Sequence, residues 1–380
     1  MSAPDPIIRI LLAGLGPDAQ VRLAVSALDE PERLRSVWAS SGALVQRDGP
    51  RLLATTTVQA LARAAGRAFG ADMAQRMANQ LRDRIAAWAG PPPALPLSTC
   101  GLATDVRPLV MGIVNVTPDS FSDGGVLYPD GHPVAAVAHG RALLTEGADV
   151  LDVGGESTRP GSEPVEIDEE LRRVVPVVAA LAAEGAVVSV DTVKRAVAEA
   201  ALDAGALIVN DVSGGRDQGL LRAVGERGAG YVLMHTRGTP TDMQSHADYD
   251  DVVAEVYEFL AAGVDRCAVA GIRRERIVLD PGLGFAKTAA HNLALLRSLR
   301  QLRGLGRPLL VGASRKSFLG ALLGGAGTND RLEGSLACAA IAVREGAALL
   351  RVHDVAATVR VANVARGVTT GALDWPPGRA

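Results

Sequence analysis

Residues 184–214 read EGAVVSVDTVKRAVAEAALDAGALIVNDVSG, and this stretch contains the unit on which the fold assignment depends. A short apolar run, Val187–Thr192, ends in polar residues, an amphipathic segment follows, and a second apolar run begins at Leu207. Gly185 and Gly205 come just before the two runs, where glycine ends a helix in a left-handed conformation. Continuous rather than alternating apolar residues are typical of strands buried on both faces of a parallel sheet. The stretch therefore predicts a strand–helix–strand unit.

The same unit recurs through the C-terminal part of the chain. Eight apolar runs lie at Leu109–Val116, Val150–Gly155, Val187–Thr192, Leu207–Ser213, Tyr231–His235, Ile277–Gly282, Leu309–Ser314 and Ala348–His353. The tripeptide Glu-Gly-Ala at 184–186 recurs at 146–148 and 345–347. Eight such units predict an α/β fold, a (β/α)8 TIM barrel over residues 106–370. An open doubly wound sheet is the competing architecture, and the number and regularity of the units favour the barrel.

The first 90 residues have a different texture. Ala43–Thr57 predicts a hairpin with its turn at residues 47–50, and Val58–Phe69 and Ala71–Trp88 predict amphipathic helices. We expect a small N-terminal α+β extension over residues 1–90, with a structural role favoured over partner binding or regulation. A Pro-rich stretch, PPPALP at 91–96, has neither helical nor strand period, so residues 91–105 are predicted to be a linker.

Composition excludes several classes of protein. A formal net charge of -3 over 380 residues gives no bulk attraction to nucleic acid. No apolar run is long enough to span a membrane, and the apolar N-terminal patch lacks a basic leader. Cys100, Cys267 and Cys338 form no CxxC pair, so we expect neither a disulfide framework nor a zinc site. We therefore expect a cytoplasmic protein.

Lysine is rare in this chain. Only three of the 39 basic residues are lysine: Lys194, Lys287 and Lys316. Arginine and lysine differ in shape and hydration, so a lysine here predicts a position where arginine would not serve.

Polar side chains gather at the C-terminal ends of all eight runs. They include Asn115, Asp152, Asp191, Asn210, His235, Asp280, Lys316, Arg351 and His353. A single polar residue of this kind is more often a strand-end cap, but eight of eight run ends are not expected on that ground. In a barrel these ends meet on the face that carries catalytic residues. Carboxylates accept paired hydrogen bonds from an amino-pyrimidinone edge, and Arg159, Arg351 and His353 suit a phosphorylated group.

Two long motifs resemble the signatures of the dihydropteroate synthase family of pterin-binding enzymes. They are MGIVNVTPDSFSDGG at 111–125 and DVGGESTRPG at 152–161. Shorter motifs follow in the order of the family, at 189–192, 210–214, 234–235, 280–287, 314–317 and 351–354. The resemblance covers residues 109 to about 368. It implies a TIM barrel that, with Mg²⁺, condenses 6-hydroxymethyl-7,8-dihydropterin diphosphate with p-aminobenzoate, giving 7,8-dihydropteroate and diphosphate in folate biosynthesis.

The resemblance also implies a role for each matching residue. The pterin pocket would contain Asp191, Asn210, Asp280 and Lys316. Asn115 would hold Mg²⁺, and Arg351 and His353 would hold the diphosphate. The p-aminobenzoate subsite would contain Thr158, Arg159, Pro160, Phe285 and Ser317. The catalytic residues would be Asp191, Lys316, Arg351 and His353. The segments 117–127 and 155–164 would be loops that close over the site, and the enzyme would be a homodimer. Lys194, after Asp191, is expected at the surface.

The match departs from the family at four positions. Leu283 and Ala286 stand where Phe and Gly are more usual and would reshape the pocket wall, whereas Thr236 and Arg237 replace Met and Gln at the expected rim. Three alternatives stay open: a catalytically silent pterin-binding paralogue, a pterin-binding barrel that passes a folate methyl group to a corrinoid, and a scaffold for a second enzyme of folate synthesis. The STRPG loop at 157–161 and the diphosphate-binding pair favour the synthase over the methyltransferase.

Overall fold

A computed structural model describes residues 7–13, 20–26, 31–40, 43–48, 51–57, 60, 71–117, 133–159 and 161–373. The chain divides into two compact units, Met1–Pro91 with Arg300–Gly306, and Pro92–Leu299 with Arg307–Ala380. Outside the described residues lie most of the predicted helix 58–69, the turn residues 49–50, residues 118–127 of the first predicted loop, and Pro160.

The first unit is built on a four-stranded antiparallel sheet of order β1-β2-β4-β3. Its elements are β1 (Ile7–Ala13), β2 (Gln20–Ser26), α1 (Pro31–Ser40), β3 (Leu44–Asp48), β4 (Arg51–Thr57) and α3 (Ala71–Ala89). Strands β3 and β4 form the predicted hairpin, and α3 is the predicted second helix. Alternate strand residues such as Ile8, Ile10, Leu23 and Leu52 share one core with Trp38 of α1 and with α3. The α+β extension is therefore confirmed, although β1, β2 and α1 were not predicted.

The second unit is a closed parallel barrel. Its strand order is β12-β11-β10-β9-β8-β7-β14-β13, and a parallel bridge between Leu279 and Leu309 joins the two ends. The strands are β7 (Leu109–Asn115), β8 (Val150–Gly154), β9 (Val188–Asp191), β10 (Ile208–Asp211), β11 (Gly230–Met234), β12 (Ile277–Asp280), β13 (Leu310–Val311) and β14 (Leu349–Val352). Each predicted run coincides with one strand, and only β11 begins a residue before its run. The TIM barrel is confirmed and the doubly wound alternative is wrong.

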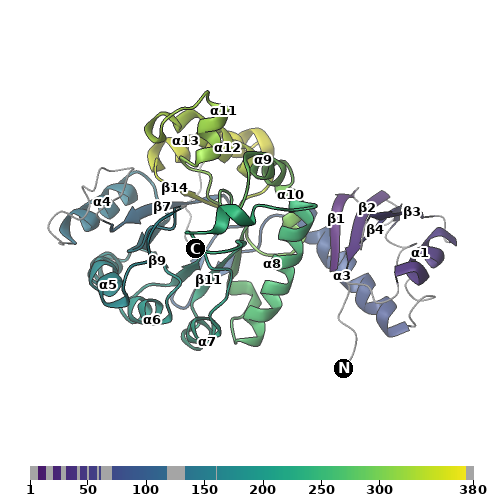
Figure 1. The fold of residues 1–380 in the computed structure, drawn as a ribbon, viewed down its shortest axis with the longest axis horizontal. Coiled ribbons are helices and arrows are strands. Elements are labelled where there is room, and N and C mark those ends of the chain that lie inside the picture. Colours follow the sequence, from purple (N-terminus) through teal and green to yellow (C-terminus); the bar gives the residue numbers. More distant parts are fainter. Residues whose placement is uncertain are drawn as a thin grey trace. The chain divides into compact units, whose positions relative to one another are not determined.

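Helices follow the strands and cover the outside of the barrel, as α5, α6 and α7 show in Figure 1. They are α4 (Val134–Thr145), α5 (Ile167–Ala183), α6 (Arg195–Asp203), α7 (Gln218–Arg227), α8 (Val252–Val269), α9 (Ala289–Arg297), α10 (Leu299–Arg303), α11 (Ser317–Leu322), α12 (Leu332–Arg344) and α13 (Val355–Thr370). Gly185 and Gly205 have φ of +81° and +108°, so the predicted left-handed helix ends are confirmed. None of the described helices is long and apolar enough to cross a membrane.

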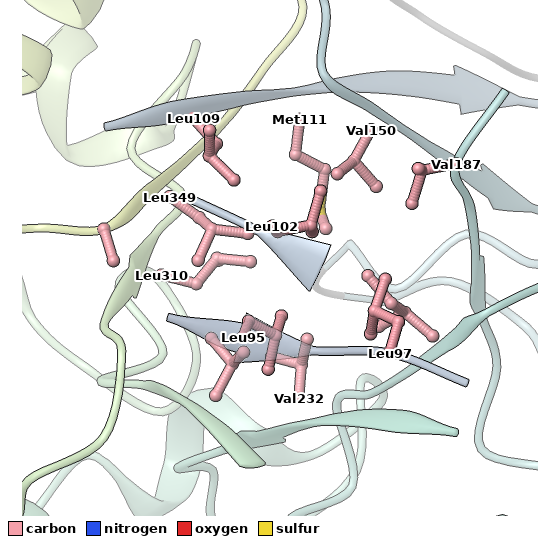
Figure 2. Close-up of a cluster of buried hydrophobic side chains, with 13 residues drawn as sticks. Leu95, Leu97, Leu102, Leu109, Met111, Val150, Val187, Val232, Leu310 and Leu349 are labelled. Atoms are coloured by element: carbon pink, nitrogen blue, oxygen red, sulfur yellow. The ribbon is translucent and has the colours of Figure 1, made fainter. Parts of the chain in front are cut away.

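One end of the barrel interior is filled by residues that precede its first strand. Strand β5 (Leu95–Pro96) pairs antiparallel with β6 (Gly101–Leu102). Figure 2 shows Leu95, Leu97 and Leu102 among side chains such as Leu109 and Leu349, which begin their strands. The three leucines are 0 %, 6 % and 1 % exposed. The predicted linker is corrected here, because these leucines form part of the barrel core at the amino ends of its strands.

Candidate active site

The carboxyl ends of the strands surround a cavity of about 420 Å³. Among its lining residues are Asn115, Thr158, Arg159, Asp191, Asn210, Asp280, Phe285, Lys316, Ser317, Arg351 and His353. Every predicted site residue therefore lines this cavity except Pro160, which lies outside the described residues. Their numbers run from 115 to 353, so closure of the barrel is what brings them together.

Arg351, on β14, is the electrostatic centre of the cavity. Its Nε donates to Oδ2 of Asp152 and its Nη2 to Oδ2 of Asp191, each at 2.6 Å. Burial lowers the pKa of Arg351, but the two carboxylates outweigh this effect and raise it above its ordinary value. Its Nη1 makes no hydrogen bond to any described residue, so one edge of the guanidinium is available to an anion.

Asp152 is a site residue that sequence reasoning noted only as a strand-end acid. It is fully buried, and its Oδ2 also accepts from Nδ2 of Asn210 at 2.9 Å. Asp152 therefore orients both Arg351 and the Asn210 amide. Glu156 and Arg331 also line the cavity and were not predicted to be site residues. Glu156 lies within the second motif, whereas Arg331 directly precedes α12, far along the chain from a strand end, and had no signal in the sequence.

Burial shifts the titration of both predicted pterin-binding acids. It raises the pKa of Asp191 to about 7, with Arg351 opposing the shift and Asp152 adding to it. The pKa of Asp280 is also raised by burial, against the hydrogen bond from the Gly282 amide (2.7 Å) and the charge of Lys316. Oδ1 of Asp191 is buried without a partner among the described residues, so it can accept a hydrogen bond from a ligand.

Two of the three lysines lie at this end of the barrel, Lys287 buried and Lys316 half-buried. Nζ of Lys316 lies 4.2 Å from the centre of the Phe285 ring, and burial, with Arg351 adding to it, lowers its pKa to about 8. Lys287 does not line the cavity; its Nζ lies 2.9 Å from both Nδ1 of His235 and the Phe285 carbonyl oxygen. Burial lowers the pKa of Lys287 to about 7. Lys316 therefore contacts the ring of Phe285, and Lys287 contacts its backbone carbonyl oxygen.

His353 differs from the cation suggested by its place in the sequence. Burial lowers its pKa to about 3, and the charges of Arg315 and Arg351 add to the shift. Its Nδ1 lies 3.0 Å from Oγ of Ser314, which also accepts from the His353 amide at 3.2 Å. At neutral pH His353 is therefore an oriented, neutral hydrogen-bonding group.

The expectation that Lys194 lies at the surface is wrong. Its side chain is 18 % exposed, and Nζ forms ion pairs with Glu156 at 2.6 Å and Glu170 at 2.5 Å. The carboxylates come from positions 38 and 24 residues earlier, which the local sequence around Lys194 could not reveal.

The four departures from the family pattern have unequal consequences. Leu283 lines the cavity, whereas Ala286 is buried away from it with φ of +49°. Thr236 is 7 % exposed and so is not a rim residue. Arg237 lies 3.9 Å from the centre of the Tyr249 ring and pairs with Glu255. The altered fifth motif is therefore a packed segment rather than a loose rim.

The cavity suits a metal ion that is bound largely through a substrate. No group of three or more His, Cys, Asp or Glu side chains that could hold a metal occurs within the part of the chain that the structure describes. Mg²⁺ prefers oxygen ligands, keeps several waters, and is commonly held by one or two protein oxygens together with substrate phosphates. Asn115, which lines the cavity, has a side-chain oxygen of this chemical type.

Comparison with known proteins agrees with this geometry. The family model described as "Pterin binding enzyme" matches residues 111–353. The chain is 48% identical over 259 residues to dihydropteroate synthase of Escherichia coli strain K12, covering 68% of this chain and 90% of that one. Dihydropteroate synthase of Xanthomonas albilineans with 4-aminobenzoic acid matches with a TM-score of 0.67 and 48% identity, over 73% of this chain and 99% of that one. The same enzyme in complex with 7,8-dihydropteroate matches with a TM-score of 0.65 and 46% identity, over 73% and 99%.

Proposed function

We infer the roles of the cavity residues from one premise: the chain belongs to the dihydropteroate synthase family of pterin-binding enzymes. It is a transferase that joins 6-hydroxymethyl-7,8-dihydropterin diphosphate to p-aminobenzoate, releasing diphosphate, in folate biosynthesis. The observation that carries the assignment is that all eight strand-end motifs meet at one cavity. That cavity has buried acids and an arginine, Arg351, that uses Nε and Nη2 but not Nη1 in hydrogen bonds with described residues.

The acidic part of the cavity would bind the pterin. Asp280 would accept hydrogen bonds from the amino-pyrimidinone edge, and the amide of Asn210, held by Asp152, would bind another part of that edge. Asp191 presents its unpartnered Oδ1 to the same ligand. Lys316, charged at neutral pH, would donate to a pterin acceptor.

The diphosphate would lie against the free edge of Arg351 and the imidazole of His353. An arriving anion favours protonation of His353, so binding would raise its low pKa. Asn115 would hold Mg²⁺ together with the diphosphate oxygens. Bound there, Mg²⁺ would supply positive charge that offsets the charge developing on the leaving group.

The remaining wall would bind p-aminobenzoate. Thr158 and Arg159 follow β8, Phe285 and Ser317 face the same cavity, and Pro160 belongs to the same motif outside the described residues. Arg159 would form an ion pair with the carboxylate of this substrate. The segments 117–127 and 155–164 would close over the site and exclude water.

The reaction needs no covalent enzyme intermediate. The bond between the pterin CH₂ and the diphosphate oxygen breaks, and the electron pair leaves with the diphosphate. Carboxylates of Asp191 and Asp280 stabilise positive charge on the pterin, while Arg351 stabilises the leaving group. The aniline nitrogen of p-aminobenzoate then forms the C–N bond and loses a proton. Its alignment by the loop residues makes the attack effectively intramolecular.

Diphosphate release by the purified chain tests the function. With pterin diphosphate and Mg²⁺ present, release should depend on p-aminobenzoate and should be lost in Lys316→Ala. Tight pterin binding without release would support the silent paralogue instead. Methyl transfer from a methylated folate to a corrinoid, without diphosphate release, would support the methyltransferase.

We also propose a cytoplasmic homodimer. The three cysteines are unpaired, as in a reducing compartment. Helices α12 and α13 carry an apolar face on which Ile341, Val364 and Val368 are 45 %, 68 % and 84 % exposed, and burying such a face is the usual basis of a symmetric contact. Light scattering checks this: a monomeric mass would contradict it. Residues 1–90, which precede the family match, would serve a structural role.

A further inference from the structure

Lys194 is a lysine to which the proposed reaction assigns no role. It directly precedes α6, and its Nζ donates three hydrogen bonds: to Oε2 of Glu156 (2.6 Å), to Oε2 of Glu170 (2.5 Å) and to the Val165 carbonyl oxygen (2.5 Å). An ammonium group has three N–H donors, so every donor is committed. A surface lysine would instead donate its hydrogen bonds to water.

Two of these acceptors are the two ends of the loop that follows β8. Oε2 of Glu156, at the start of the loop, also accepts from the amide of Val165, at its end, at 2.7 Å. One ammonium and one carboxylate oxygen therefore join residues 156 and 165 directly. We call these contacts among Lys194, Glu156 and Val165 the loop clasp.

Glu170 ties the loop clasp to the barrel. It lies on α5, its side chain is 1 % exposed, and its second oxygen accepts from Oγ1 of Thr192 at 2.7 Å. Thr192 directly follows β9 and Asp191. The end of the loop is thus held against two elements of the barrel by a partly buried charge network, in which ion pairs are screened less than at the surface.

The loop closed by the clasp carries residues of the cavity wall. Ser157, Thr158 and Arg159 all line the cavity. Farther along, the Gly161 amide donates to the Pro240 carbonyl oxygen at 2.9 Å. Within the loop, Oγ of Ser162 donates to the carbonyl oxygens of Ser157 (2.5 Å) and Arg159 (2.8 Å). The clasp fixes the two ends of the loop, and these inner contacts transmit that position to Thr158 and Arg159.

We propose that Lys194 is a positioning residue for p-aminobenzoate, because the loop clasp holds Thr158 and Arg159 over the subsite where that substrate binds. This inference rests on the proposed function for the roles of those two residues. Burial lowers the pKa of Lys194, but its hydrogen bonds with Glu156 and Glu170 outweigh burial and raise it, so the clasp stays charged. Lysine is required since three acceptors surround one nitrogen, whereas a guanidinium spreads its donors along a plane.

Steady-state kinetics of Lys194→Met test the inference. The KM for p-aminobenzoate should rise about tenfold or more, since a shift of the order of an ångström in a positioning group has effects of that size. The KM for the pterin diphosphate should stay within about twofold, because none of its proposed contacts is lost. Lys194→Arg restores the charge without the geometry and should give an intermediate KM for p-aminobenzoate.

Arg141→Met is the matched control. It removes a cation from an exposed pair with Glu184 (2.6 Å; 58 % and 40 % exposed) that does not line the cavity, and both KM values should be unchanged. A folded Lys194→Met protein with both KM values as in the unmodified chain would overturn the inference. So would an equal rise of both values, because it would indicate general loosening of the site.

Hydrogen exchange without substrates separates this inference from the proposed function. The amide of Val165 should exchange about tenfold faster or more in Lys194→Met, since its acceptor loses its counter-ion. If Lys194→Met does not fold, Glu156→Gln should show the same direction with a smaller change. Unaltered exchange at Val165 would overturn the clasp. Absence of diphosphate release from the unmodified chain would overturn the function, and the exchange result would still decide the clasp.

Discussion

Turnover should have a narrow pH range set by two buried groups of opposite charge. Asp191 must be ionised to stabilise positive charge on the pterin, and burial raises its pKa to about 7. Lys316 must be protonated to donate to the pterin, and burial lowers its pKa to about 8. Because kcat/KM reports the ionisation of the free enzyme, its profile should rise through pH 7 and fall above pH 8.

The size of the effect follows from these values. At a pH of about 6, one unit below the pKa of Asp191, roughly 9% of the carboxyl groups are ionised, so kcat/KM should be about tenfold below its plateau. Asp191→Asn keeps the shape of the side chain and removes its charge. This variant should lose about 100-fold in kcat/KM near pH 7.5, since a positioned charge in a dry site is worth that much. It should also lose the dependence on pH between about 6 and 7.5.

The assay is diphosphate release at low pterin diphosphate concentration across the pH range, for the unmodified chain, Asp191→Asn and Lys316→Arg. The substrate phosphates also titrate, and a separate titration of free substrate gives their contribution. Lys316→Arg should keep the acid limb and move the alkaline limb upward, because a guanidinium does not lose its proton. An Asp191→Asn variant with full turnover, or with the acid limb of the unmodified chain, would refute the role of this carboxylate.

Three further predictions concern buried residues. Asp152→Asn removes one counter-charge of Arg351, and it removes a charge that raises the pKa of Asp191. We expect a loss of about 2 kcal/mol in unfolding free energy and an acid limb of the kcat/KM profile at lower pH. An unmoved acid limb would contradict the coupling between Asp152 and Asp191. Lys287 has a folded pKa of about 7 against an unfolded value near 10.4, so the unfolded state binds more protons and stability should rise by up to about 1.4 kcal/mol per pH unit above pH 7. Denaturant titrations at several pH values should show this rise in the unmodified chain and a flatter dependence in Lys287→Met; equal slopes would count against it. Leu102→Ala should cost about 2–5 kcal/mol in the same assay; a loss below about 1 kcal/mol would return residues 91–105 to the role of a linker.

The barrel was predictable because its signals are local and repeated. Each strand is a short apolar run, each helix end before a strand has glycine, and polar residues lie at or just beyond the end of each strand, so errors in one unit are corrected by the other seven. The site was predictable for the same reason: closure of the barrel brings residues such as Asn115, Asp280 and Arg351 to one face whatever the details of the loops.

The parts that were missed depend on contacts between distant residues. Leu95, Leu97 and Leu102 lie among prolines, and only the closed barrel provides the space that they fill. The apolar patch that forms β1 was considered only as a possible leader, and no strand was predicted there; its Arg9 interrupts the apolar pattern, yet Arg9 is 7 % exposed within the sheet. Asp152 was visible as an acid, but its hold on Arg351 joins positions 199 residues apart.

The rarity of lysine in this chain indicates where a compact positive charge is needed. All three lysines are at least partly removed from water, with 18 % exposure for the Lys194 side chain and Lys287 at 4 %. For Lys316 the neighbour is an aromatic ring, with the charges of Asp280 and Asp191 acting on the ammonium; for Lys287 the neighbours are a carbonyl and an imidazole, and for Lys194 three oxygens. A guanidinium has its donors spread over a plane and does not place three of them on one nitrogen, as the contacts of Lys194 require. A chain that uses arginine wherever a surface cation suffices therefore marks, by its exceptions, the places where a compact charge is required. Lys194→Arg is the sharpest test of this argument, because it changes the shape of the cation and leaves its charge.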